Sequence, residues 1–123
     1  MDFTDKLDIL YARRSSEDGK DGESIENQVA LLKQYAADKG YYNIKVVTDD
    51  GYTGTNFNRP GFQEAFALIQ HRRVGRFIVK DLSRLGRNTI EVGQYIGVIF
   101  PRFGVEFISV HDGPESSDPD SLV

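Results

Sequence analysis

Short apolar segments alternate with segments of helical periodicity along most of the chain, and this alternation is the strongest constraint on the fold. Residues 7–13, 44–48, 77–79 and 105–110 are short and apolar and predict strands. Between them, apolar residues recur at helical spacing, as in Ile25, Val29 and Leu32. Strands that alternate with helices form a largely parallel sheet with helices on both faces. We therefore predict a three-layer α/β fold with a largely parallel sheet of four to five strands.

Capping and breaking residues indicate where the predicted helices begin and end. Ser24 is a candidate N-cap for a first helix that ends near residues 39–40. Pro60 suits the first turn of a second helix. Asn88 is placed to cap a third helix, which we expect Pro101 to stop. Residues 81–87 are predicted to form a loop or one short turn.

Composition excludes several classes of protein. The 123 residues are enough for one domain, and the absence of cysteine excludes a disulfide scaffold and a thiol nucleophile. No apolar run approaches the roughly 20 residues of a membrane span. We expect a soluble, cytoplasmic protein with no membrane association. The net charge of −4 is a poor overall balance for a freestanding DNA-binding protein.

Cations gather in the segments that follow the predicted strands. In a parallel sheet, the loops after the strands meet at one edge, where ligands bind. Those loops carry Arg13, Ser15, Ser16, Arg59, Arg84 and Arg87. A hydroxyl group among arginines suits phosphoryl transfer, because guanidinium groups match phosphate oxygens and stabilise the charge of the transition state.

The spacing within this set makes further predictions. Arg84 and Arg87 are three residues apart, so a helical turn would place them on one side. Gly86 between them would let the backbone approach a phosphate closely. Without other motifs, an R-x-x-R pair is more often a surface feature than a catalytic one.

Four motifs together resemble the catalytic domain of serine site-specific recombinases, the resolvase/invertase family. Residues 11–16 resemble its Y-x-R-x-S motif, and residues 24–28 its S-I-x-x-Q. Residues 51–61 resemble its G-x-S/T-G…R-P-G loop, and residues 83–88 its D-R-L-x-R-N segment. The motifs occur in the family order over about residues 7–110. Residues 80–87 and 91–95 look most like large serine recombinases of transposon type.

The resemblance implies a resolvase-like fold and a mechanism. Ser15, which the motif register selects over Ser16, would attack a DNA phosphate to give a 5′-phosphoserine link and a free 3′-hydroxyl. Arg13, Arg84 and Arg87 would hold the scissile phosphate, and Arg59 and Gln28 would support the site. Cleavage would occur in a synaptic tetramer built from dimers, followed by subunit rotation and religation. Neither a metal nor ATP nor any other cofactor would be needed.

The resemblance also implies that this is one domain of a longer protein. Residues 1–110 would be the catalytic domain, and residues 111–123 a flexible tail before a long helix and DNA-binding domains. We therefore expect the isolated domain to be inactive and to bind DNA poorly. The whole protein would be a bacterial homo-oligomer that binds DNA and moves a mobile element.

One position departs from the family pattern. Ser83 stands where the family usually has Asp before the first arginine of D-R-x-x-R. Asp81 is the candidate to replace that carboxylate in proton transfer. The alternative, which we favour, is that Asp81 makes a local salt bridge at the end of the third strand.

Two other functions are compatible with parts of the sequence. A non-catalytic flavodoxin-like module would bind a phosphate or ligand with an anion cradle of Ser15, Ser16 and Gly19. A metal-dependent nuclease would use Glu17, Asp49 and Asp81. A stable serine-linked DNA adduct would exclude the first, and activity that resists chelators would exclude the second.

Overall fold

A computed structural model describes residues 6–15 and 23–112 and shows a four-stranded parallel sheet. The strands are β1 (Leu7–Arg14), β2 (Ile44–Asp50), β3 (Val74–Val79) and β4 (Glu106–Ser109). Their order in the sheet is β2-β1-β3-β4, and all three neighbouring pairs are parallel. The carboxyl ends of the strands therefore share one edge. The predicted α/β fold is confirmed, with four strands.

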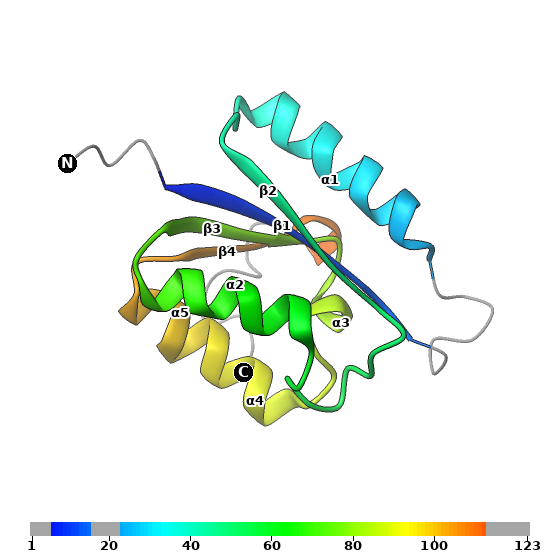
Figure 1. Ribbon diagram of the computed structural model, residues 1–123, viewed down its shortest axis with the longest axis vertical. Helices are drawn as coiled ribbons and strands as arrows, with labels where there is room; N and C mark the ends of the chain where they lie inside the picture. The colour runs from blue at the N-terminus through cyan, green and yellow to red at the C-terminus, as the bar shows by residue number, and fades with distance from the viewer. Residues whose placement is uncertain (1–5, 16–22, 113–123) are drawn as a thin grey trace.

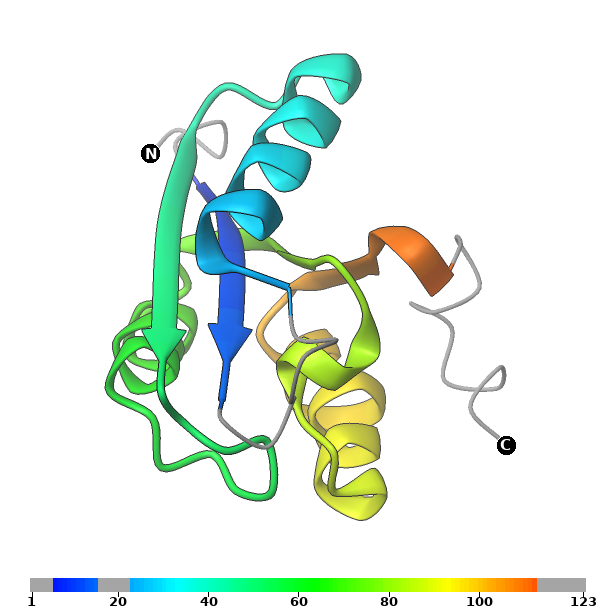
Figure 2. The same cartoon turned by 90° about the vertical axis from the view of Figure 1, so that its right-hand side faces the viewer.

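Helices cover both faces of this sheet. They are α1 (Ile25–Lys39), α2 (Pro60–Gln70), α3 (Leu82–Leu85), α4 (Thr89–Gln94), the π-helical turn η3 (Tyr95–Ile99), α5 (Phe100–Arg102) and the 3₁₀ turn η4 (Val110–Asp112). Figures 1 and 2 show α1 on one face, and α2 with the continuous α4–η3–α5 helix on the other. This is the predicted three-layer arrangement.

The alternation of side chains along β1 divides the core in two. Ile9 and Tyr11 point into the larger cluster, which α2 and the α4–η3–α5 helix cover. Leu10 points to the other face, where it packs with Ile78 and with Leu32 of α1. Both faces of the central strands are thus buried from solvent, as expected for a parallel sheet.

Several helix ends follow the predicted capping. The Ser24 hydroxyl accepts a hydrogen bond from the Asn27 amide at 3.1 Å. The Asn88 side chain accepts from the amides of Ile90 and Glu91. Gly40 ends α1 in the left-handed conformation, with φ of 79°. These three local predictions are confirmed.

The predicted stop at Pro101 is wrong, because the helix continues to Arg102. The Phe100 amide bonds to the Tyr95 carbonyl, five residues back, so the turn before the proline is π-helical. A wider turn gives the proline ring room beside the preceding carbonyls, which an ordinary α-turn does not.

The end of the described chain is more ordered than the sequence predicts. His111 and Asp112, expected to begin a flexible tail, belong to η4. The rest of that tail lies outside the described residues. Within residues 6–15 and 23–112, no helix is long and apolar enough to cross a membrane.

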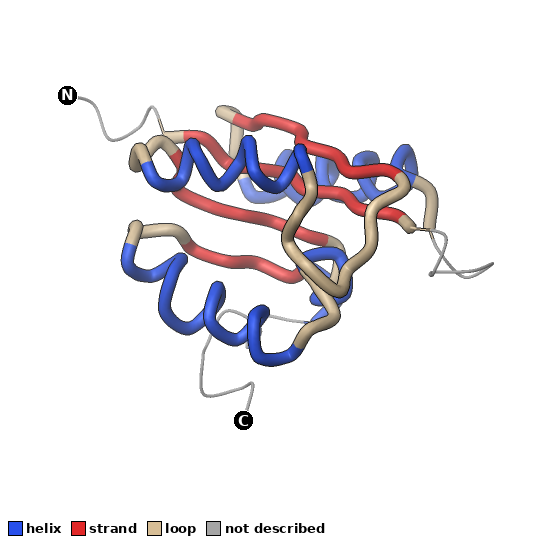
Figure 3. The backbone as a smooth tube through the Cα atoms, turned by 60° about the horizontal axis from the view of Figure 1, so that its bottom comes forward, coloured by secondary structure: helices blue, strands red, loops and turns tan. Residues whose placement is uncertain are grey.

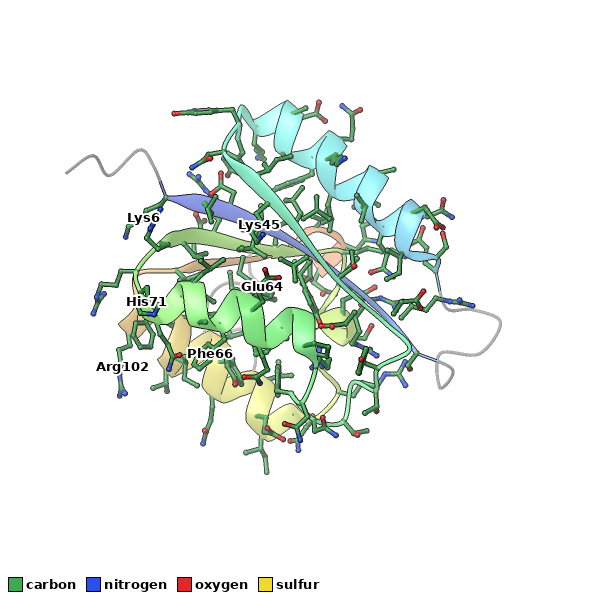
Figure 4. All side chains as sticks on the ribbon, in the orientation of Figure 1. Lys6, Lys45, Glu64, Phe66, His71 and Arg102 are labelled. Atoms are coloured by element: carbon green, nitrogen blue, oxygen red, sulfur yellow. The ribbon has the colours of Figure 1, made fainter. Side chains whose placement is uncertain are left out.

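The amino ends of the strands form the edge opposite the predicted site. Figure 4 shows Lys6, His71 and Arg102 at that end of the molecule, and Lys45 of β2 beside Glu64 of α2. The Lys45 Nζ lies 3.7 Å from a Glu64 carboxylate oxygen. His71 and Arg102 are exposed at helix C-termini, where the positive charge of Arg102 interacts favourably with the helix dipole.

The α1 face has few core residues, so each should contribute strongly to stability. Leu32 is fully buried there. Leu32→Ala is expected to lower the free energy of unfolding by about 2–5 kcal/mol, because it removes apolar contacts and leaves a cavity. Urea denaturation measures this, with the half-exposed Val98→Ala as a control that should change it by less than about 0.5 kcal/mol. Equal effects of the two variants would contradict this description of the core.

Candidate active site

The candidate site lies at the carboxyl edge of β1 and β3, where the strand order reverses. From β1 the chain crosses to β2 on one side, and β3 pairs on the other. Such a switch point leaves an opening for ligands in doubly wound sheets. Figure 3 shows the loops after β2 and α3 coming together at this end, and the Arg87 amide donates to the Gly54 carbonyl at 2.7 Å.

Arg13, near the end of β1, is completely buried. Its guanidinium donates to three carbonyls: Ser83 at 2.7 Å, Tyr52 at 2.9 Å and Arg84 at 3.3 Å. These carbonyls belong to the loops that follow β2 and β3. Arg13 therefore joins the end of β1 to the segments that follow β2 and β3.

Gln28 of α1, also fully buried, pairs with the backbone of Arg13. Its side-chain oxygen accepts from the Arg13 amide at 3.2 Å, and its Nε2 donates to the Arg13 carbonyl at 3.0 Å. Nε2 also donates to the Glu23 carbonyl at 2.9 Å. The glutamine thereby fixes the end of β1 against the start of α1.

Arg59 precedes α2 and is the second completely buried arginine. Its guanidinium donates to the carbonyls of Leu85 at 2.5 Å and Arg84 at 3.3 Å. It also lies over the Phe57 ring, 4.7 Å from the centroid. Arg13 and Arg59 thus both donate hydrogen bonds to carbonyls of the α3 turn.

A buried tyrosine, Tyr11, and a buried aspartate, Asp49, support Arg59. The sequence suggested for Asp49 only a metal-binding role in the alternative nuclease, and for Tyr11 no role of its own. The Tyr11 hydroxyl accepts from Arg59 Nη1 at 2.9 Å and donates to an Asp49 oxygen at 2.7 Å. Asp49 also accepts from the amides of Gly61 at 2.7 Å and Phe62 at 2.9 Å. The available signal was the alternation of β1, which puts Tyr11 and Arg13 on the core-facing side with Ile9.

The surroundings of Tyr11 keep its hydroxyl neutral. Burial raises the pKa of the Tyr11 phenol well above its ordinary value, and its hydrogen bond to Asp49 raises this pKa further. The charge of Arg59 lowers the same pKa, but by less than burial raises it. Tyr11 therefore remains a donor to Asp49 at all ordinary pH values.

Arg84 and Arg87 do not share a helical face, contrary to the prediction. The α3 helix ends at Leu85, and Gly86 continues as extended backbone. Arg84 is buried and donates from Nη1 to the Arg13 carbonyl at 2.9 Å, whereas Arg87 is exposed.

Gly54 and Gly86 lie where an added side chain would meet close neighbours. A Cβ at Gly54 would lie 2.8 Å from Arg13 Nη2. A Cβ at Gly86 would lie 3.1 Å from both Phe57 and Val92. Gly86 is buried, and the approach of its backbone to a phosphate stays a prediction.

Asp81 has a local structural role. Its side chain caps α3 by accepting from the Ser83 amide at 3.0 Å, and it also accepts from the Ser83 hydroxyl. An Asp81 oxygen lies 3.8 Å from Arg84 Nε. The carboxylate expected at position 83 therefore lies two residues earlier, beside the same arginine.

Ser15 follows β1 directly and is buried, with 6% of its surface exposed. Ser16, Glu17 and Gly19 lie outside the described residues. Among those that are described, no three His, Cys, Asp or Glu side chains gather in a way that could hold a metal ion. Both Asp49 oxygens already accept protein hydrogen bonds.

Comparison with known proteins identifies the family. Residues 9–123 match the family described as the resolvase N-terminal domain. The chain belongs to the resolvase family. The predicted resemblance is thereby confirmed over nearly the whole sequence.

Solved structures of serine recombinases share this fold. The N-terminal catalytic domain of TP901-1 integrase is 28% identical with a TM-score of 0.79, over 95% of this chain and 86% of that one. A resolvase family site-specific recombinase from Streptococcus pneumoniae is 28% identical with a TM-score of 0.74, over 95% and 83%. A serine recombinase from Sulfolobus solfataricus is 30% identical with a TM-score of 0.68, over 95% and 76%. This resolvase is thus a recombinase catalytic domain, and the non-catalytic binding module is not favoured.

The raised pKa of Tyr11 predicts how the stability of this resolvase domain depends on pH. Above pH 10.0, the ordinary tyrosine value, the phenol ionises in the unfolded chain but stays neutral in the folded one, so stability falls as pH rises. Tyr11→Phe should make this decline shallower. At pH 8 the variant should lose about 1–3 kcal/mol, because Arg59 and Asp49 each lose a buried partner. Urea denaturation at pH 8 and 10.5 measures both effects, and an equally steep decline in the variant would refute the assignment.

Proposed function

We propose that this domain cuts and rejoins DNA at specific sites, with Ser15 as the nucleophile. The Ser15 oxygen attacks the phosphorus of a phosphodiester, and the bond from phosphorus to the 3′-oxygen breaks. The products are a 5′-phosphoserine link and a 3′-hydroxyl, which carries a proton equivalent to the one that the serine loses. Religation is the reverse reaction, and the phosphoserine ester retains the energy for it.

The observation that carries this proposal is the hydrogen bond from Arg84 Nη1 to the Arg13 carbonyl at 2.9 Å. It brings a guanidinium to the end of β1, two residues before Ser15. A serine hydroxyl is a weak nucleophile at neutral pH, so it requires a strongly positive surrounding or a base. The guanidinium of Arg84, held at the end of β1, contributes to that positive surrounding.

The burial of the arginines suggests a division of roles. We assign contact with the scissile phosphate to Arg84 and Arg87, since Arg87 is exposed and Arg84 lies at the end of β1. Arg13 and Arg59 have their guanidinium groups on backbone carbonyls, so they are positioning residues. Gln28 holds the strand end that leads into Ser15. This assignment moves Arg13 from the phosphate-binding set that the resemblance implies.

We assign Asp81 to the orientation of Arg84 rather than to proton transfer. One of its oxygens accepts hydrogen bonds from both the amide and the hydroxyl of Ser83. The same oxygen is the one nearest to Arg84 Nε. A carboxylate held in this way is suited to fixing a guanidinium.

DNA is the proposed partner despite the negative net charge. Eight acids lie outside the described residues, namely Asp2, Asp5, Glu17, Asp18, Asp21, Glu115, Asp118 and Asp120. Lys20 is the one base among those residues, so the described part of the chain has more cations than anions. We propose that this domain belongs to a longer, cytoplasmic protein (the parent protein), which has further DNA-binding domains. We expect the parent protein to act as a dimer and synaptic tetramer.

The nucleophile is tested by covalent trapping in the parent protein. A DNA substrate nicked near the cleavage site should trap a serine-linked adduct with the wild type and with Ser16→Ala, but not with Ser15→Ala. Peptide mass spectrometry of the adduct identifies the serine. An adduct with Ser15→Ala, or none with the wild type on its own DNA site, would overturn the proposal and favour a binding module.

The division among the arginines predicts different effects on rate and stability. Arg87→Ala should slow single-turnover cleavage by about 10³-fold or more and leave stability nearly unchanged, because Arg87 is exposed. Arg59→Lys should slow cleavage and also destabilise the fold, because lysine cannot reproduce a planar set of four hydrogen bonds. Arg102→Ala, at the opposite edge, is the control. Loss of stability in Arg87→Ala without loss of rate would contradict the assignment.

A further inference from the structure

The α3 turn bears Arg84 but is too short to satisfy its own backbone. It has four residues, and the first amides of any helix lack partners within the helix. The Ser83 amide bonds to the Asp81 side chain, and the Arg84 amide bonds to the Asp81 carbonyl at 3.1 Å. Both partners are local. The first amide of the turn, that of Leu82, requires a partner from elsewhere.

That partner comes from η4, thirty residues later in the chain. The Leu82 amide donates to Asp112 Oδ2 at 2.9 Å. The Ser109 hydroxyl, at the end of β4, donates to the same oxygen. The His111 amide donates to the Lys80 carbonyl at 2.8 Å, so η4 is joined to the segment before α3 at a second point.

The opposite side of the same turn meets the buried arginines. Arg13 binds the carbonyls of Ser83 and Arg84, and Arg59 binds those of Arg84 and Leu85. The amides of Leu82 and Ser83 are thus held by carboxylates, and the carbonyls from Ser83 to Leu85 by guanidinium groups. A small shift of a group that contacts a reacting phosphate has a large effect on rate.

We infer that Asp112 is a positioning residue for the α3 turn and that it couples the end of β4 to Arg84. It acts through Leu82 and does not touch the DNA. This inference rests on the proposed function, because it assumes that Arg84 contacts the scissile phosphate. Displacement of η4 would then lower the rate of cleavage without weakening the affinity for DNA.

Three variants of the parent protein test the inference. Asp112→Ala removes the acceptor, whereas Asp112→Asn keeps a side-chain oxygen that accepts from the Leu82 amide. Leu82→Pro removes the donor, and proline is compatible with the first position of a helix that follows an extended residue, as Asp81 is. Asp38→Ala, an exposed acid on α1, is the matched control.

Hydrogen exchange measures the coupling without any DNA. Asp112→Ala should speed exchange of the Leu82 amide by about five- to tenfold, while the amides of Phe77–Val79 in β3 keep their wild-type rates. Asp112→Asn and Asp38→Ala should exchange as the wild type does. Unchanged exchange at Leu82 in Asp112→Ala would overturn the inference even if the proposed function holds.

Cleavage kinetics measure the consequence. At saturating DNA, Asp112→Ala should slow phosphoserine formation by about tenfold or more, with an unchanged Kd for DNA and recovery in Asp112→Asn. In a double-mutant cycle, Asp112→Ala should add nothing to Leu82→Pro. Additive effects, or a wild-type rate in Asp112→Ala, would refute the coupling. If the wild type itself forms no adduct, the proposed function fails, and the exchange result still decides whether Asp112 holds the turn.

Discussion

The structure of this site depends on buried guanidinium groups that bind peptide carbonyls. The Ser83, Arg84 and Leu85 carbonyls belong to a turn too short to pair them internally. Arg13 and Arg59 reach this turn from β1 and from the entrance of α2. Because each arginine has five donors in a rigid plane, one side chain can bind several loops at once. Without them, the buried carbonyls of this turn would lack these partners, and the loops would lose most of their side-chain links to β1 and α2.

The cost of burying these charges is distributed over the surrounding protein. Arg59 lies against the Phe57 ring and donates to the neutral Tyr11 hydroxyl, which in turn donates to Asp49. The carboxylate therefore stabilises the cation through an intermediate phenol rather than by direct contact. Asp49 also holds the first amides of α2, so one buried acid fixes both the helix and the arginine. Stability and site geometry are consequently linked in this domain.

The sequence predicted the four strands and their parallel arrangement from periodicity, although β3 begins at Val74, three residues before the predicted start. It also predicted that Arg13, Arg59 and Arg84 lie at one edge of the sheet, as the structure shows. Ser24 and Asn88 cap helices by contacts within three residues, which is why they were predictable. The π-turn before Pro101 was not, since its backbone geometry has no reliable residue signature. The partners of Arg13 were also hidden, because they are carbonyls, and every residue type has one. When a buried arginine binds backbone carbonyls, residues of any type can be its partners, so the sequence does not reveal them.

The same reasoning explains how position 83 tolerates a departure from the family motif. The contact that joins this position to Arg13 uses the Ser83 carbonyl, which a serine supplies as well as an aspartate. The Ser83 side chain instead donates to Asp81, and the Asp81 carboxylate lies beside Arg84. An aspartate at position 83 would put a second negative charge next to Asp81, where like charges disfavour each other. Serine at 83 and aspartate at 81 therefore form a compatible pair, which keeps a carboxylate beside Arg84 and leaves the backbone contacts of Arg13 intact.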